Sequence, residues 1–522
     1  MFCGGVVFRR VPWFSPFFPL GRRSKTSSAG VNLPSPPSPF YGGSRRGGGK
    51  GLPRAEVERL MRTMPSRNIR TFSIIAHVDH GKSTLSDRFL QTTGTIPPDA
   101  PEQYLDSLEV ERSRGITVKA QTCTMFWENP GDGETYVINL IDTPGHSDFS
   151  YEVSRSLAAC QGALLLVDST QGIQAQTVAN FYLAFANDLV IVGACSKIDI
   201  PRGRQLLPET KAEVARLADC PPDAVSAVSA KTGEGVVELL QRVIREIPPP
   251  VGDPDAPLRA LLFDCSFVQG KGTVLLVCVQ EGCLKKGAKV LAFHSSLTFQ
   301  IEETGILHPP LAMTSLESLQ AGQVGYAVVT LKQTRDVRVG DTLFIASDVM
   351  PSEHAGGPPR PPSDPIPAFQ PARQMVWAGV FPEDPSQSDA LQQAMGRVML
   401  SDAAISATPE VSEALGLGFR CGFLGLLHLD VFKQRMEGEF GVKVIACAPT
   451  VPFRVGIGRG EGEEVRVVES AAQFPDVVTR CEEPLCEATI LVPQAYLKNV
   501  EVLCIERRGE QTRIEFLSGG GG

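Results

Sequence analysis

Three absences limit what this 522-residue chain can be. No uninterrupted apolar run approaches the roughly 18 residues of a membrane-spanning helix, which excludes an integral membrane protein. None of the 13 cysteines forms a CxxC pair, so the sequence predicts buried reduced thiols rather than a zinc site or a disulfide framework. Residues 1–55 contain nine Lys or Arg and no acidic residue.

The acid-free N-terminus has the composition of a mitochondrial transit peptide, which is rich in Arg, carries Ser and avoids acids. An amphipathic helix there could use Val6, Val7, Phe8 and Val11. We predict a disordered transit peptide over residues 1–53. The alternative is a disordered tail that carries no targeting signal. The remaining chain carries 41 basic and 58 acidic residues, and this net charge of −17 weighs against a nucleic-acid binder.

A phosphate-binding loop is the clearest motif in the chain. The apolar run from Phe72 to Ala76 predicts a buried strand, and the helix predicted after it has Leu85, Phe89 and Leu90 on one face. The sequence between them, AHVDHGKST, follows the pattern of a loop that wraps a polyphosphate with backbone N–H groups. A strand before and a helix after make this a specific signal.

Each residue type in this loop has a chemical reason. Gly81 lets the backbone approach the phosphates, and the following helix directs its N-terminal dipole at them. Lys82 would neutralise the β- and γ-phosphates, and the Ser83 hydroxyl would bind Mg²⁺. The residues predicted to hold the nucleotide here are Ala76, His77, Val78, Asp79, His80, Gly81, Lys82, Ser83 and Thr84.

Two later motifs predict the machinery of hydrolysis. A long loop over residues 92–111 leads to Thr117, whose hydroxyl could reach Mg²⁺ while a γ-phosphate is present. Asp142 ends a predicted strand and could hold Mg²⁺, and the Gly145 N–H could meet the γ-phosphate. His146 is placed to orient an attacking water and is the predicted catalytic residue. The metal-binding set is therefore Ser83, Thr117 and Asp142.

Strands and helices alternate as far as residue 250, which predicts a mostly parallel sheet with helices on both faces. Ligands bind at the carboxyl ends of such strands. One end carries Ser196-Lys197-Ile198-Asp199, in which the Asp199 carboxylate would accept two N–H bonds from guanine and so select it over adenine. The next carries Ser229, Ala230 and Lys231, where the Ala230 N–H could meet the guanine oxygen.

These motifs stand in the order and spacing of a translational GTPase. Phrases such as SIIAHVDHGKSTLSDRFL and DTPGHSDFSYEVSRSLAACQGALLLVD closely resemble the LepA family, also called elongation factor 4, and the N-terminal extension resembles its mitochondrial form. The resemblance runs from about residue 66 to 510 and includes GFRCGFLGLLH near residue 418. It implies GTP/GDP and Mg²⁺ as cofactors.

The resemblance implies a series of domains that agrees with the patterns in the sequence. We expect an α/β phosphate-loop GTPase domain, then an all-β barrel like the second domain of elongation factors, then α+β ferredoxin-like domains. The predicted boundaries are 1–53 (transit peptide), 66–250 (GTP-binding), 256–347 (barrel), 348–373 (Pro-rich linker), 374–453 (third domain), 454–482 (connector) and 483–522 (incomplete fifth-type domain).

The sequence departs from the family at two places. Ser196 replaces the usual Asn of the guanine motif, and because serine reaches less far we expect weaker nucleotide binding with guanine selectivity kept. Affinity should then rise in Ser196→Asn.

Only about one strand–helix unit fits between residues 483 and 516, and the family's C-terminal domain is absent, so we expect a truncated form whose last sheet exposes an unpaired edge.

The resemblance implies a ribosome-dependent GTPase of mitochondrial protein synthesis that moves ribosomes back by one codon. Its partners would be the mitochondrial ribosome, with rRNA and ribosomal proteins, and indirectly tRNA. The expected chain is a monomer on the matrix side, peripheral at the inner membrane. The alternative is a GTP-dependent ribosome-binding module without productive turnover. A membrane-associated signalling GTPase is disfavoured because no lipidation motif is present.

Overall fold

The computed structural model describes residues 3–11 and 52–516, apart from 107, 269, 331–337, 350–360, 371, 403, 413–414, 449–452, 458–463, 469–473 and 494–495. Most of the predicted transit peptide and part of the predicted linker therefore lie outside the described residues. Within the described part of the chain, no helix combines the length and the apolar character needed to cross a bilayer.

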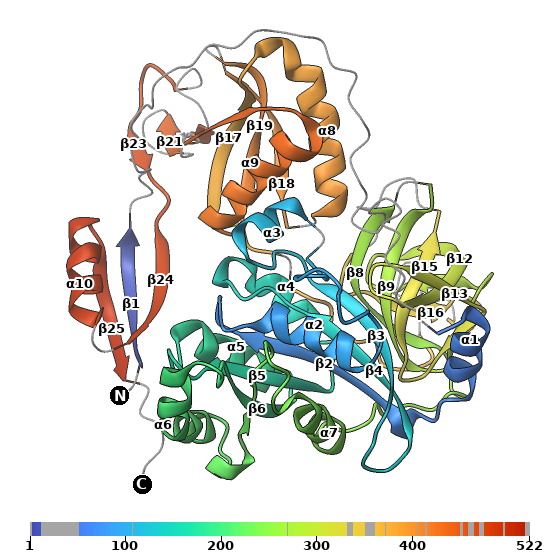
Figure 1. Cartoon of the computed structure of the whole chain (residues 1–522). Coiled ribbons are helices and arrows are strands. Elements are labelled where there is room, and N and C mark those ends of the chain that lie inside the picture. Colours follow the sequence, from blue (N-terminus) through green and yellow to red (C-terminus); the bar gives the residue numbers. More distant parts are fainter. Residues whose placement is uncertain are drawn as a thin grey trace, which may run out of the picture.

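The nucleotide-binding motifs lie on a six-stranded sheet in the order β3-β4-β2-β5-β6-β7 (Figure 1). All neighbouring strands are parallel except β3 and β4, which form an antiparallel pair. The sheet is therefore mostly parallel, as predicted. Its strands are β2 (Ile69–Ala76), β3 (Gln121–Glu128), β4 (Thr135–Asp142), β5 (Gly162–Asp168), β6 (Val190–Ser196) and β7 (Ser226–Ala227).

Helices cover both faces of this sheet, because each presents an apolar face to the buried strands. One face packs against α2 (Lys82–Thr92) and α7 (Val236–Glu246). The other packs against α4 (Ser150–Leu157), α5 (Ala175–Ala186) and α6 (Pro201–Leu217). Strand β3 and helix α6 were not predicted, and a short helix, α3 (Glu109–Arg114), begins within the expected loop.

A closed β-barrel follows, with strand order β11-β16-β8-β9-β15-β12-β13 and a further pairing of β11 with β12 that closes the ring. A separate pair joins β10 to β14. Helix α1 (Arg54–Thr63) packs Val57 and Met61 into the barrel core. The strands are β8 (Arg259–Val268), β9 (Gly272–Glu281), β10 (Cys283–Lys285), β11 (Lys289–Ala292), β12 (Leu297–Leu307), β13 (Met313–Leu316), β14 (Ser318–Gln320), β15 (Val324–Val329) and β16 (Thr342–Ile345).

The next unit, which we call the 376–447 module, has a four-stranded antiparallel sheet in the order β18-β19-β17-β20. Its chain order of strand, helix, two strands, helix and strand is that of a ferredoxin-like fold. Its elements are β17 (Val376–Pro382), α8 (Ser388–Ser401), β18 (Ser406–Ser412), β19 (Gly416–Phe423), α9 (Leu426–Phe440) and β20 (Val444–Cys447).

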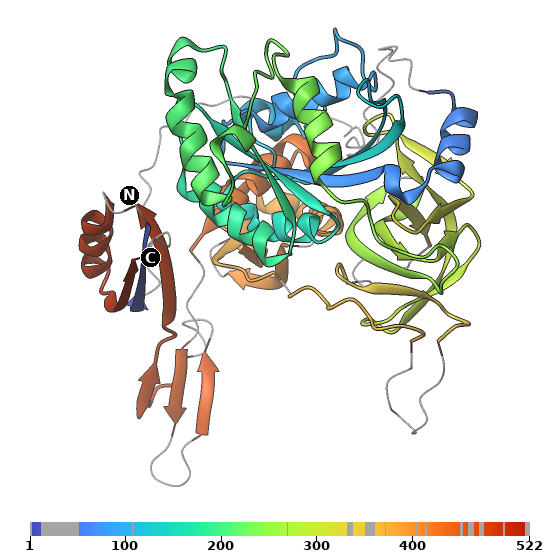
Figure 2. The ribbon, with the colours of Figure 1, turned by 90° about the horizontal axis from the view of Figure 1, so that it is seen from below.

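The connector predicted over 454–482 is wrong in its described part, where a three-stranded sheet in the order β22-β21-β23 forms. Three of the four residues of VRVV within it are valines, which are β-branched and favour strands. Figure 2 shows this sheet and the last one as two separate units beside the rest of the molecule. The strands are β21 (Phe453–Ile457), β22 (Glu464–Val468) and β23 (Arg480–Glu482).

The last sheet corrects the prediction for the N-terminus. Strand β1 (Cys3–Val11) lies between β24 (Cys486–Pro493) and β25 (Glu510–Phe516), beside helix α10 (Leu497–Glu506). Residues 3–11 are thus neither disordered nor helical. The physical reason is that β24 and β25 each present backbone N–H and C=O groups that need partners, and the backbone of β1 pairs with both strands in antiparallel register.

The 376–447 module packs on the GTPase unit through His428. Its ring lies between the rings of Phe149 and Phe423, with centroids 5.8 and 5.6 Å away. His428 Nε2 lies 2.9 Å from the Asp402 carboxylate, and Nδ1 lies 3.1 Å from the Leu424 nitrogen. His428 is therefore a buried packing residue at the contact between the two units.

This ion pair makes the stability of the module depend on pH. Burial lowers the pKa of His428, but the Asp402 carboxylate and the charge of Glu152 outweigh burial and the opposing charge of Arg435, so the pKa is raised. A raised histidine pKa stabilises the fold below its ordinary value of about 6.5, and this stabilisation is lost as pH rises through the raised pKa.

We therefore expect wild-type thermal stability to fall as pH rises from about 6.5 through the raised pKa of His428, and we expect His428→Asn to lose most of that dependence. The measurement is a set of melting curves for both chains across this range. An equal slope in both chains would contradict the assignment to this pair.

Candidate nucleotide-binding site

The predicted binding motifs meet at one edge of the six-stranded sheet. Strands β2, β4 and β6 run parallel, so the loops after Ala76, Asp142 and Ser196 emerge at the same edge. The loop that follows β7 joins them because β7 pairs in parallel with β6. Residues far apart in the chain are thereby brought together around the start of α2.

The phosphate-binding loop has the backbone geometry that its glycine predicts. Gly81 caps helix α2 with φ +92°, and Asp79 also lies in the left-handed region at φ +64°. Helix α2 begins at Lys82, so its unpaired N–H groups lie at the end of the loop. This is the arrangement expected for binding an anion at a helix N-terminus.

The two loop histidines have different surroundings. His80 is fully buried, and its Nδ1 accepts the N–H of Asp168 over 3.2 Å. Burial, and to a lesser degree the neighbouring His77, lower the pKa of His80 to about 4, so its ring is neutral at physiological pH. His80 therefore faces the sheet, and its contribution to the loop is its backbone. His77 and Val78 are partly exposed, and Asp79 and Thr84 are exposed.

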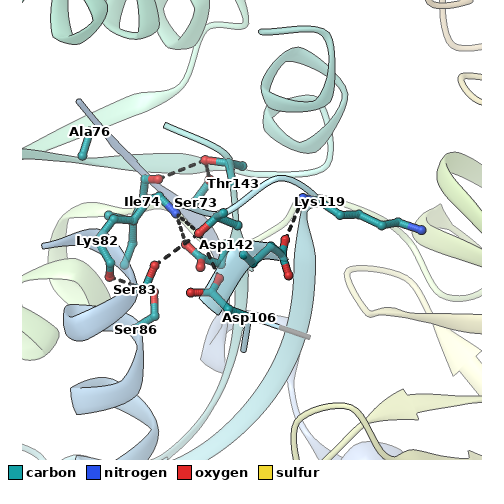
Figure 3. Close-up of polar contacts among 12 residues, drawn as sticks. Ser73, Ile74, Ala76, Lys82, Ser83, Ser86, Asp106, Lys119, Asp142 and Thr143 are labelled. Atoms are coloured by element: carbon teal, nitrogen blue, oxygen red, sulfur yellow. Dashed lines mark hydrogen bonds and ion pairs between the residues drawn. The ribbon is translucent and has the colours of Figure 1, made fainter. Parts of the chain in front are cut away.

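The Lys82 ammonium connects the loops at the centre of the site (Figure 3). It donates to Thr117 Oγ1 over 3.0 Å and lies 3.1 Å from Asp142 Oδ1. The Ser83 hydroxyl lies 3.2 Å from the same threonine oxygen. The structure thus brings together the three residues predicted to bind the metal, Ser83, Thr117 and Asp142, around the lysine.

Asp106 and Glu111 were not predicted to belong to the site. In the sequence, nothing distinguishes them from the other acidic residues of their loop. Asp106 is 1% exposed and accepts the Thr117 hydroxyl over 3.1 Å. Glu111 accepts the N–H groups of Leu108, Val118 and Lys119. Burial raises the pKa of Asp106 to about 6 and that of Glu111 to about 7. Both acids fix the position of the loop that carries Thr117.

The donors at this site fit Mg²⁺, which prefers oxygen ligands and keeps several waters and phosphate oxygens. Asp142 Oδ2 and Asp106 Oδ2 are buried and have no hydrogen-bond partner, so each leaves an acceptor unsatisfied beside the Ser83 and Thr117 hydroxyls. No group of three or more His, Cys, Asp or Glu that could hold a metal occurs among the described residues. A magnesium site that relies on phosphate oxygens needs no such cluster.

Gly145 and His146 lie beside the phosphate-binding loop. A Cβ at Gly145 would come within 3.3 Å of the Ala76 carbonyl and 3.4 Å of the Val78 nitrogen, so only glycine allows this close approach without displacement. His146 follows with its side chain about one-third exposed, and Nδ1 accepts the N–H of Asp148 over 3.1 Å. This bond leaves Nε2 as the donor of the neutral ring.

Ser196 connects the predicted base-binding segment to the phosphate-binding loop. Its hydroxyl donates to the His80 carbonyl over 2.7 Å, so the serine does reach this partner in spite of its short side chain. Lys197 donates to the Asp79 carbonyl over 2.6 Å and pairs with Asp168. The expected weaker nucleotide binding stays a prediction, but lack of reach to the loop is not its cause.

The Asp199 carboxylate is hydrogen-bonded to Ser229, in the segment that follows β7. Ser229 donates to Asp199 Oδ1 over 2.8 Å, while Asp199 itself is exposed and so accessible to a base. Arg88 of α2, which was not predicted, donates to the carbonyls of Ala230 and Lys231. The base-binding segment is therefore anchored to the helix that follows the phosphate-binding loop.

This loop geometry is accompanied by two buried carboxylates and two hydroxyls, and a closed barrel follows the parallel sheet. Together with the family match that follows, these features identify a GTP-hydrolysing protein of the translation-factor class. The family described as elongation factor Tu GTP binding domain matches residues 67–249. A crystal structure of a protein from Thermus thermophilus shares the fold with a TM-score of 0.56 and 17% identity, covering 77% of this chain and 72% of that one.

Relatives specify the family further. A rice (Oryza sativa subsp. japonica) translation factor GUF1 homolog, mitochondrial, is 47% identical over 87% of this chain and 67% of its own. Elongation factor 4 of Aquifex aeolicus is 44% identical over 87% of this chain and 73% of its own. The chain belongs to the elongation factor 4/GUF1 family of translational GTPases, as the motifs predicted.

The contact of Ser196 with the phosphate-binding loop should be necessary for tight binding. Ser196→Ala leaves the His80 carbonyl without this donor, and the loss of such a bond costs on the order of 1–2 kcal/mol, or roughly 5- to 30-fold in affinity. The measurement is GTP affinity by fluorescent-nucleotide titration, with the exposed Ser347→Ala as a control.

Ser196→Asn is still predicted to bind more tightly than the wild type. Unchanged affinity in Ser196→Ala would show that the contact does not contribute.

Proposed function

We propose that this chain is a ribosome-dependent GTPase of mitochondrial protein synthesis that promotes the backward movement of ribosomes by one codon. Membership of the elongation factor 4/GUF1 family supports the translational role, and the relatives named mitochondrial support the compartment. The proposed partners are the rRNA and proteins of the mitochondrial ribosome and, through it, tRNA. The chain would act as a monomer on the matrix side, peripheral at the inner membrane.

The observation that carries the proposal is the cluster around Lys82. A buried ammonium that already contacts Thr117 and Asp142 provides positive charge where the β- and γ-phosphates would lie. The N–H groups at the start of α2 would bind the same phosphates. Mg²⁺ held by Ser83, Thr117 and Asp142 would offset charge that develops during phosphoryl transfer.

His146 has the role of orienting the attacking water. Because Nδ1 accepts the Asp148 N–H, the neutral ring has Nε2–H available as a donor to a water oxygen. The side chain is partly exposed, so it can reorient when the ribosome contacts this loop. Departure of the γ-phosphate would release the loops that carry Thr117 and Gly145.

Nucleotide selection is assigned to the segments after β6 and β7. Asp199 would accept the N1–H and amino group of guanine, with Lys197 along the base and Ser229, Ala230 and Lys231 around its oxygen. We also propose 66–250 as the GTP-binding domain, 256–347 as the barrel domain, 374–453 as the third domain and 483–522 as belonging to a domain of the fifth type.

The test of hydrolysis compares wild type with His146→Ala, with and without mitochondrial ribosomes. The ribosome should stimulate the wild type, and His146→Ala should lower stimulated kcat by about 10²- to 10⁴-fold while GTP affinity stays within about twofold. Wild-type binding to ribosomes without stimulated hydrolysis would support the alternative of a binding module.

The movement of the ribosome needs a separate measurement. Mitochondrial ribosomes held in the post-translocation state on a defined message should shift back by one codon when the chain and GTP are added, as read by primer-extension mapping. The Lys82→Ala variant, which lacks the phosphate-binding ammonium, is the control and should leave the position unchanged. A wild-type chain that hydrolyses GTP on the ribosome but does not shift it would contradict the back-translocation role alone.

A further inference from the structure

Asp148 joins the loop that carries His146 to the start of helix α9 in the 376–447 module. Its backbone N–H donates to His146 Nδ1 over 3.1 Å, and its carboxylate lies 3.4 Å from the same nitrogen. The other carboxylate oxygen accepts the N–H of Leu427, in the first turn of α9, over 2.9 Å. One side chain thus bridges a loop of the GTPase unit and a helix that begins nearly 280 residues later.

This contact requires glycine at the residue that precedes α9. Gly425 has φ −167°, an extended conformation open to any residue, so its backbone does not demand glycine. Glycine is required instead because of the space available: a Cβ at Gly425 would overlap the carboxyl group of Asp148. Any larger side chain there must move Asp148 away from the helix.

Helix α9 also contacts the loop that carries Thr117. Val431 of α9 packs in one buried cluster with Val110 and Val118, which flank that loop, and with Phe149, next to Asp148. Arg114 of α3 donates to Gln434 of α9 over 3.0 Å. The two loops proposed to respond to the γ-phosphate therefore meet on the same helix, as the neighbouring positions of α3, α4 and α9 in Figure 1 show.

The start of α9 is held in place by packing and hydrogen bonds, so it can position Asp148. His428 is buried and fixed by Asp402, Leu424 and two aromatic rings. Packed side chains of this kind occupy single rotamers, and a helix moves as one body. A displacement of α9 would therefore be transmitted to Asp148 rather than absorbed locally.

We propose that Asp148 is a positioning residue that couples His146 to the N-terminus of α9, so that His146 is correctly placed for hydrolysis only while the 376–447 module is docked. The inference rests on the proposed role of His146. It assigns the module a part in catalysis, because movement of α9 at the ribosome changes the position of the histidine.

Charge contributes to this coupling. Burial raises the pKa of Asp148, but the hydrogen bonds that its carboxylate receives, among them those from the N–H groups of Leu427 and His428, outweigh burial, and the pKa is lowered. The carboxylate is therefore ionised at neutral pH, and an ionised group is held more strongly at a helix N-terminus than a neutral one.

The decisive comparison is Gly425→Ala against Gly438→Ala. Both substitutions add one methyl group to the α9 segment, but a Cβ at Gly438 meets nothing within 4 Å. We measure ribosome-stimulated hydrolysis, with kcat and KM separated, together with GTP affinity and melting temperature. Gly425→Ala should lower kcat by about 10- to 100-fold with unchanged GTP affinity, since displacement of a catalytic group by about 1 Å has effects of this size. Gly438→Ala should match the wild type.

A double-mutant cycle distinguishes positioning from general damage. If Gly425→Ala acts through His146, adding it to His146→Ala should lower kcat no further, because the group it displaces is already absent. A merely structural loss would multiply the two effects. Multiplied effects, or wild-type kcat in Gly425→Ala, would overturn the inference.

If Gly425→Ala fails to fold, Asp148→Asn provides a second test of the same inference. It preserves the shape and an acceptor oxygen but removes the charge, and kcat should fall by about 3- to 10-fold with GTP affinity kept. Wild-type kcat in Asp148→Asn would then overturn the inference. Absence of stimulated hydrolysis in the wild-type chain would instead overturn the proposed function, so the two failures are distinguishable.

Discussion

A buried positive charge organises the functional part of this molecule. The Lys82 ammonium is almost fully enclosed, and a charge removed from water must find partners of opposite sign or strong dipoles. In the structure it finds Thr117 and Asp142, which come from different loops. The same lysine therefore holds the loops together and marks where the phosphates of a nucleotide would lie.

The cluster also explains why acids accumulate around the site. Asp106 accepts the hydroxyl of Thr117, which in turn accepts from the lysine, and Glu111 accepts backbone N–H groups just beyond that threonine. Among the residues that the structure describes, neither carboxylate forms an ion pair with a cation, and burial raises the pKa of both. Such an arrangement favours the arrival of positive charge, which agrees with a site built for a nucleotide and Mg²⁺.

A second junction connects this site to the rest of the chain. Phe149 lies one residue beyond Asp148 and packs against His428, while Val110 and Val118 pack against Val431. The GTPase unit and the 376–447 module thus share a buried apolar surface beside the loops that surround the nucleotide. In a translational GTPase this is a direct physical route by which the nucleotide and the outer part of the protein can affect one another.

The sequence by itself determined the nucleotide-binding motifs, the parallel sheet, the barrel and the family, because loops that bind phosphate need particular residues at fixed local spacing. It did not reveal β3 or α6, and it misplaced residues 3–11, whose strand exists only because β24 and β25 lie on either side of it. Nor did it reveal Asp106, Arg88 or the contact between Asp148 and Leu427. These depend on which loops meet in space, and such long-range contacts leave no local pattern, so only the tertiary structure decided them.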